Sequence, residues 1–212
     1  NLQVIKVLKD VVVARALDLD GKSLSPDDRI LKSTGQMTLQ ERRIAHTIRV
    51  DQAPSLDGRL DDAAWKNAPP VEGLVQRNPA YWMPITDRTL VRIVYDNDKI
   101  YFGFECHGNP EKIVTNNMRR DSEINGDDHV QILLDPYNDR QTGVFFYVNA
   151  LGARRDLLLS NEGRTNNEDW DCIWEARTQR HDWGWSAEIA IPFDQLRFNE
   201  EEEMVWGLNV GR

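Results

Sequence analysis

From residue 48 onward, the chain is a succession of short apolar runs separated by turn-forming residues. Each run is rich in Val, Ile, Phe, Tyr or Trp, and each is bounded by Asp, Asn, Gly or Pro. This is the pattern of short β-strands joined by tight connections, without the alternating helices of a parallel sheet. It predicts strands over 90–95, 100–107, 130–134, 144–149, 153–159, 174–179, 185–191 and 205–210.

Alternation within the runs, and the residues between them, predict antiparallel pairing. Val91 and Ile93 alternate with Arg92, as in a half-buried strand. The connections 95–99 and 149–153 consist of residues that tolerate turn geometry, which favours hairpins. Two short helices are expected in this part of the chain, 60–68, opened by Asp61 or Asp62, and 193–196, after a proline. We therefore expect an all-β fold, an antiparallel, jelly-roll-like β-sandwich with one or two short helices.

The first 47 residues differ in character from the rest. An apolar opening is followed by turn-rich residues at 20–21 and 25–28, which predicts one or two strands and then a linker. We expect an N-terminal arm or linker over 1–47 and one β-sandwich domain over 48–212. The chain opens with Asn1-Leu2-Gln3, without an initiator Met or a signal-peptide pattern, so it looks like a piece cut from a longer protein.

Charge and hydropathy narrow the classes of partner. The formal net charge is -9 and the pI is about 5.0, whereas nucleic-acid affinity comes largely from Lys and Arg that displace counterions. No nucleic-acid partner is therefore expected. No window approaches the roughly 20 apolar residues of a membrane helix, so we expect no transmembrane segment in this fragment.

Cys106 and Cys172 fit either one disulfide or two buried thiols, and their spacing leaves both open.

An ordered set of motifs runs through the predicted sandwich. It comprises Ser-Leu-Asp-Gly-Arg-Leu-Asp-Asp-Ala-Ala-Trp at 55–65, Val-Tyr-Asp at 94–96, Ile-Tyr-Phe-Gly-Phe at 100–104, Arg-Asp at 120–121, Asp-Asp-His-Val-Gln-Ile-Leu-Leu-Asp at 127–135, Phe-Tyr-Val-Asn at 146–149, Gly-Trp-Ser-Ala-Glu-Ile-Ala-Ile-Pro-Phe at 184–193 and Trp-Gly-Leu-Asn at 206–209. This succession resembles the family 9 carbohydrate-binding module. More narrowly, it is similar to the version at the N-terminus of large bacterial proteins whose remainder is a predicted outer-membrane β-barrel.

The resemblance implies a non-catalytic domain that binds glycan chain ends, with structural calcium and a link to carbohydrate catabolism. It implies a place in the bacterial periplasm, outer membrane or cell surface, where the barrel portion of the parent chain is a further candidate partner. At the ligand positions this chain departs from the sugar-binding members. Asn125 stands where the sugar-binding members have a stacking Trp, and Gln131 stands where they have an acid. Tyr147 stands where they have an Arg before a Val-Asn pair, and the Asn of that pair is Asn149 in this chain. The resemblance therefore supports an inference about the fold more strongly than one about the ligand.

Aromatic side chains outside the strands are candidates for ligand contact, because the apolar face of a sugar ring stacks on a flat aromatic ring. Tyr81, Trp82 and Trp170 lie in loop-like stretches and are predicted to bind ligand. Structural roles are expected for the remaining tryptophans, as core residues, helix anchor and hairpin cap: Trp174, Trp185, Trp206, Trp65 and Trp183.

Two groups of charged residues are candidates for a binding rim and for a metal site. Arg119, Arg120 and Asp121 form either a rim that binds hydroxyls or a salt bridge that holds their loop in place. Calcium needs several oxygen ligands, which carboxylates can supply even though no EF-hand loop is present. The predicted metal ligands are Asp127, Asp128, Asp135, Asp139 and Asp156.

Catalysis is not indicated by any sequence motif. The chain has no Gly-x-Ser-x-Gly, no His-Glu-x-x-His, no phosphate loop and no Cys-x-x-Cys. We therefore expect a binding domain and not an enzyme. Two alternatives stay open: a structural or partner-docking domain without sugar binding, and a haem-binding sandwich of a redox subunit with Met83, Met118 and His129 as candidate ligands.

Overall fold

The computed structural model describes residues 3–8, 11–15, 43–71, 74–76, 83–124, 126–199 and 203–212. Nearly all of their regular structure is β. The strands are β1 (Gln3–Leu8), β2 (Val11–Arg15), β3 (Arg43–Arg49), β4 (Thr89–Tyr95), β5 (Lys99–His107), β6 (His129–Asp135), β7 (Gly143–Asn149), β8 (Arg154–Ser160), β9 (Thr165–Asn167), β10 (Glu175–His181), β11 (Gly184–Pro192) and β12 (Glu203–Gly211). The helical elements are α1 (Ala63–Asn67) and the 3-10 turns η2 (Pro110–Lys112) and η3 (Phe193–Gln195).

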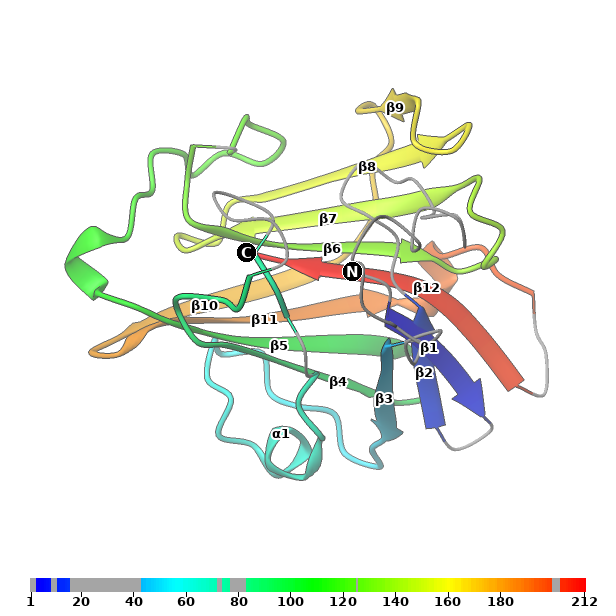
Figure 1. Ribbon diagram of the computed structural model, residues 1–212, viewed down its shortest axis with the longest axis horizontal. Helices are drawn as coiled ribbons and strands as arrows, with labels where there is room; N and C mark the ends of the chain where they lie inside the picture. Colours follow the sequence, from blue (N-terminus) through cyan, green and yellow to red (C-terminus); the bar gives the residue numbers. More distant parts are fainter. Residues whose placement is uncertain are drawn as a thin grey trace, which may run out of the picture.

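The strands form two layers. One has the order β10-β11-β5-β4 and the other β12-β6-β7-β8-β9, with β3, β1 and β2 between β4 and β12. Figure 1 shows β6, β7 and β8 in the upper half of the molecule and β4, β5 and β11 in the lower half. Pairing within each layer is antiparallel. The predicted antiparallel β-sandwich is therefore confirmed.

The core lies between the two layers. Phe102 and Ile189 contribute from one layer, Ile132 and Phe146 from the other, and all four are fully buried. Each such side chain stabilises the fold by roughly 1.5–3 kcal/mol. Three predicted core tryptophans are confirmed as buried members of this cluster: Trp174, Trp185 and Trp206.

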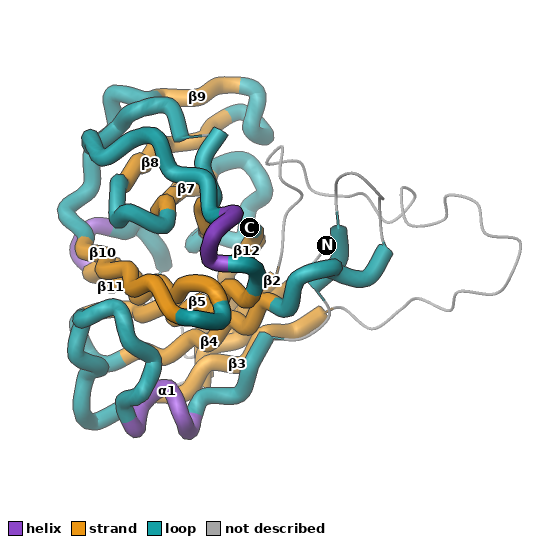
Figure 2. Tube along the Cα trace, turned by 90° about the vertical axis from the view of Figure 1, so that its left-hand side faces the viewer, coloured by secondary structure: helices purple, strands orange, loops and turns teal. Residues whose placement is uncertain are grey.

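Helix α1 packs on the outer face of the β4–β5–β11 layer, where Trp65 is buried against Val94 and Tyr101. The helix is shorter than the predicted 60–68: it begins after Asp62, whose carboxylate makes no capping hydrogen bond, and it ends before Ala68, which is extended ahead of Pro69. That carboxylate instead accepts a hydrogen bond from the Ser55 backbone N–H at 2.8 Å. In Figure 2, α1 and β9 lie at opposite ends of the molecule. The outer face of the second layer is therefore far from the helix.

The N-terminal strands β1 and β2 fall in the segment for which one or two strands were predicted, while residues 16–42 lie outside the described residues. The proposed division after residue 47 stays a prediction, and β3 spans that position.

Cys106 and Cys172 are both buried free thiols, and burial raises the pKa of each to about 12. Among the described residues, no helix has the length and apolarity needed to cross a membrane.

Candidate functional site

Three polar side chains form a row across the outer face of the β6–β7–β8 layer. Gln131 on β6 pairs with Tyr147 on β7, and Tyr147 pairs with Arg155 on β8. On the opposite side of β6, Gln131 pairs with Gly211 of β12. A side chain at position 211 would collide with Gln131, because its Cβ atom would lie only 2.8 Å from the Gln131 amide nitrogen. Because directly opposite residues point to the same side of a sheet, these side chains lie next to one another. We call Gln131, Tyr147 and Arg155 the polar row.

An apolar cluster adjoins the polar row on the same face. Leu133, Phe145 and Leu157 occupy the next register positions along their strands, and Tyr147 packs against them. The rings of Phe145 and Tyr147 are stacked, with centroids 4.9 Å apart and planes at 11°. The ring of His129 lies on the other side along β6, 5.8 Å from that of Tyr147. Polar groups therefore stand beside a firmly packed aromatic ring.

Arg155 is held by two carboxylates from different loops. Its Nη1 lies 3.4 Å from Glu123 Oε1, and its Nη2 donates to Glu168 Oε1 at 2.9 Å. Only 13% of the Arg155 side chain is exposed, whereas 66% of Glu123 and 64% of Glu168 is exposed. The guanidinium is thus fixed against the sheet while both acids face solvent.

The Tyr147 hydroxyl stays protonated over the physiological range. Burial raises its pKa to about 12, with the Glu123 carboxylate acting in the same direction and Arg155 in the opposite one. Tyr147 can therefore donate and accept a hydrogen bond. The polar row as a whole offers amide, hydroxyl and guanidinium groups, a combination suited to binding the hydroxyls of a polar ligand.

Asn149, a predicted ligand residue, uses its amide inside the protein. Its Nδ2 donates to Asn117 O at 2.7 Å and to Asp127 Oδ2 at 2.8 Å, and its Oδ1 accepts from the Ala153 N–H at 2.8 Å. These bonds fix the loop before β6 to the turn between β7 and β8. Asn149 therefore supports the site without being placed to contact ligand.

The charged group at 119–121 is a salt-bridge network, the structural alternative of the two considered. Arg120 Nη2 contacts Asp156 at 2.9 Å and also contacts Asp171, and its Nε lies 3.2 Å from Asp121. The same Nη2 donates to the Cys172 carbonyl at 3.0 Å. Arg119 is exposed on the same loop, and its carbonyl accepts from Ser122.

Of the three predicted aromatic contacts, the structure describes Trp170. Trp170 is partly buried against the main core, edge-on to Phe146 with ring centroids 6.3 Å apart. Tyr81, Trp82 and Asn125 lie outside the described residues. Trp183 lies in the β10–β11 turn as predicted, stacked on His181 with centroids 4.3 Å apart.

The five predicted metal ligands do not come together. Within the part of the chain that the structure describes, no three His, Cys, Asp or Glu side chains are placed to hold a metal ion. Their carboxylates accept hydrogen bonds from N–H groups instead: Asp127 from Asn116 and Asn117, Asp128 from Val114, Asp135 from Asp139 and Arg140, Asp139 from Gln141 and Thr142, and Asp156 from Cys172 and Trp174. This set does not fit a shared calcium site, and calcium dependence stays a prediction.

Asp135 gives the chain a testable pH dependence. Its side chain is fully buried, and burial raises its pKa from 3.8 to about 6, despite backbone hydrogen bonds from Arg140 and Asp139. Because the folded state holds the proton more tightly, this carboxyl stabilises the fold below pH 4, and the contribution is lost as pH rises through 6. The loss is about 3 kcal/mol for a shift of this size.

Urea unfolding of the wild type and Asp135→Asn gives the difference in unfolding free energy between the two proteins. We expect this difference to change by about 2–3 kcal/mol between pH 4 and pH 7. The wild type should lose stability relative to the variant as pH rises. A gap that stays constant with pH would contradict the raised pKa.

The three haem candidates have surface environments. Met83 and Met118 are 55% and 75% exposed. His129 Nδ1 lies 2.8 Å from the Asp127 carbonyl, so that ring nitrogen already has a hydrogen-bonding partner. Nothing in these surroundings favours the haem alternative over the others.

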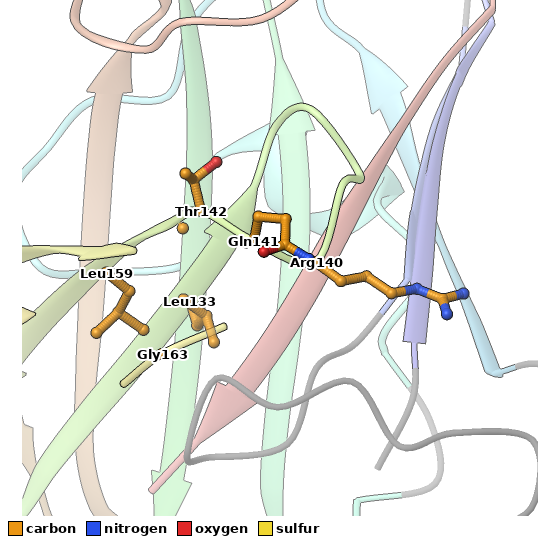
Figure 3. Close-up of a pocket in the computed structure, with 7 residues that line it drawn as sticks. Leu133, Arg140, Gln141, Thr142, Leu159 and Gly163 are labelled. Atoms are coloured by element: carbon orange, nitrogen blue, oxygen red, sulfur yellow. The ribbon is translucent and has the colours of Figure 1, made fainter. Parts of the chain in front are cut away.

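A shallow hollow lies at the far end of the same outer face. It is lined by Leu133, Leu159, Gly143, Gly163 and the 140–142 turn. Figure 3 shows the Arg140 side chain pointing away from Leu133 and Leu159. Because Leu133, Leu159, Gly143 and Gly163 offer no side-chain hydrogen-bonding group, the hollow is a weaker candidate than the polar row.

The fold is similar to that of solved family 9 carbohydrate-binding modules. A module from Caldicellulosiruptor kristjanssonii in complex with cellotriose has a TM-score of 0.54 at 17% identity, covering 77% of this chain and 74% of that chain. A structure from the same organism in complex with glucose has a TM-score of 0.52 at 17% identity, covering 77% and 76%. No protein-family model matches the sequence, and no curated protein matches it.

A third solved structure, a candidate carbohydrate-binding protein from Bacteroides uniformis, has a TM-score of 0.51 at 12% identity. The match covers 72% of this chain and 77% of that chain. At these identities the similarity establishes the fold, which is that of the family 9 modules. The fold implied by the order of the sequence motifs is thereby confirmed.

Proposed function

We propose that this chain is a non-catalytic carbohydrate-binding domain that binds glycan on the outer face of the β6–β7–β8 layer. The polar row carries the proposal, because it sets hydrogen-bonding groups from three strands beside a packed aromatic ring. The similarity in fold to modules solved with cellotriose and glucose supports the same class of ligand.

The chemistry of the polar row matches that of a sugar. Hydroxyl groups both donate and accept, and they can be bound by the Gln131 amide, the Tyr147 hydroxyl and the Arg155 guanidinium together. The Tyr147 ring offers an apolar surface for the carbon-bound hydrogens of a sugar ring. Gln131 and Tyr147 are two of the positions that the family resemblance marked for ligand contact, and Arg155 supplies a guanidinium one strand away.

The proposal includes a cellular context. The parent would be a larger bacterial cell-envelope protein of the periplasm, outer membrane or cell surface, acting in carbohydrate catabolism and carrying this domain beside its barrel portion. The support for this context is the order of the sequence motifs, which is similar to that of such proteins.

A glycan-array and affinity-gel screen of the purified chain tests the proposal, with glucose and cellotriose included and with calcium or a chelator added. Binding would support the sugar class, and its loss on chelation would support structural calcium. Silence towards all glycans from a chain with a cooperative unfolding transition would contradict the proposal and favour the structural or partner-docking alternative.

Tyr147→Phe isolates one group of the site. It removes the hydroxyl but keeps the ring stacked on Phe145, so we expect glycan affinity to fall about three- to tenfold with little change in stability. Isothermal titration calorimetry with the best glycan of the array measures the change. Tyr137→Phe is the matched control, because Tyr137 is an exposed tyrosine on the β6–β7 turn. Equal affinities for all three proteins would exclude the Tyr147 hydroxyl from the site.

A further inference from the structure

The Arg155 guanidinium is bridged by carboxylates that come from two separate loops. Glu123 lies on the segment before β6, and Glu168 follows β9. Both terminal nitrogens of the guanidinium are engaged, Nη1 by Glu123 and Nη2 by Glu168. We call Glu123, Arg155 and Glu168 the acid bridge.

We infer that the acid bridge makes the site selective for neutral sugars and rejects sugars that carry a carboxylate. This inference rests on the proposed function, since it concerns the specificity of the same site. The ligand class is a neutral, hydroxyl-rich ring, and the excluded class is the uronic acids.

Hydrogen-bonding capacity is the first reason. A sugar hydroxyl can donate to Glu123 or Glu168 while it accepts from Arg155, so it joins the acid bridge without breaking it. A ligand carboxylate can only accept, and the guanidinium nitrogens that would bind it already face acids. It would either displace one of them or lie beside both, and in each case like charges are left close together.

Charge is the second reason. The acid bridge holds two carboxylates and one guanidinium, and the protonated Tyr147 and the amide of Gln131 add no charge. The charges of the described side chains at the site therefore sum to a negative value, on a chain whose formal net charge is -9. Both acids are mostly exposed, so they face an incoming ligand directly and repel an anion.

Glucose and glucuronate test the inference, because they differ only at C6. We expect the wild type to bind glucose at least about fivefold more tightly than glucuronate at low salt, with a smaller ratio at 0.5 M salt. In E123Q/E168Q the ratio should fall to about one or reverse, because amides do not repel the carboxylate and Arg155 becomes available to it. Saturation-transfer NMR or calorimetry can measure affinities in this weak range.

E111Q/E175Q is the control, because it removes the same charge from exposed positions on η2 and β10, away from the β6–β7–β8 layer. We expect it to keep the wild-type ratio. Wild-type binding of both sugars with equal affinity, or an unchanged ratio in E123Q/E168Q, would overturn the inference while leaving the proposed function standing. Binding of neither sugar by the wild type and the variants would overturn the inference, and the proposed function falls as well when the full glycan array is silent.

Discussion

Replacing Glu188 by alanine is expected to lower the free energy of unfolding by about 3–5 kcal/mol, the largest effect of any substitution considered for this chain. Glu188 is fully buried on β11. One of its oxygens accepts from the N–H groups of Asp57 at 2.8 Å and Gly58 at 2.7 Å, and the other accepts from the Trp65 indole at 2.7 Å. Alanine would leave these donors without an acceptor and open a cavity under α1.

The segment that Glu188 anchors has little freedom to rearrange. The Gly58 carbonyl accepts from Ser186 Oγ at 2.6 Å, and His181 Nε2 lies 2.7 Å from the same hydroxyl. Gly58 has a φ of 88°, and a Cβ there would lie 2.8 Å from the Thr178 backbone. Because the segment is held from several sides, the unsatisfied donors cannot turn to solvent without loss of the α1 packing.

Urea unfolding followed by tryptophan fluorescence measures the effect. The control is Glu175→Ala on β10, where an exposed carboxylate pairs with Lys99 at 3.2 Å and a loss below about 1 kcal/mol is expected. A loss of similar size in both variants would show that the buried acceptor contributes no more than a surface ion pair.

Periodicity and turn chemistry were enough to predict the sandwich, but not all of its edges. The strongly apolar runs at 100–107 and 185–191 became the central strands β5 and β11, because their side chains fill both faces of the sheet. Strand β9 was missed, since Thr165–Asn167 is entirely exposed and carries no hydrophobic signal. Its pairing with β8 depends on backbone hydrogen bonds, which leave no trace in side-chain pattern.

The candidate site was only partly predictable, because a site across strands depends on register. Gln131 and Tyr147 were singled out through the family resemblance, and the structure makes them direct partners. Arg155 was missed. Alternation alone does not say which of two neighbouring arginines faces outward, and Arg154 instead donates to the Trp174 carbonyl.

The carboxylates were ambiguous in sequence for a related reason. An acid near a loop resembles a metal ligand whether it will meet an ion or a set of N–H donors, and only the folded backbone distinguishes them. Asp127 accepts from Asn149 and Asn116, bonds that outweigh its burial and lower its pKa. It therefore orders the loop before β6 from within the protein.

Asp156→Ala is the second substitution with a large expected effect, about 3–4 kcal/mol of unfolding free energy. The Asp156 carboxylate is buried and accepts from the Cys172 N–H at 2.8 Å and the Trp174 indole at 3.0 Å, and it pairs with Arg120. These contacts fix the 171–174 segment across β8 and hold Trp174 in the core. Alanine would leave two buried donors without their acceptor and would remove the buried carboxylate partner of Arg120.

The other two carboxylate partners of Arg120 serve as matched controls, because they share its guanidinium but not the burial. The Asp121 and Asp171 side chains are 49% and 75% exposed, so Asp171→Ala should cost less than about 1 kcal/mol. Asparagine replaces Asp121 for the same test, because its φ of 58° disfavours alanine. The series should be measured with and without EDTA. Since the neighbours of Asp156 are N–H donors, its large loss should be the same in both conditions. A loss that disappears in EDTA would show instead that Asp156 stabilises the fold through a bound cation.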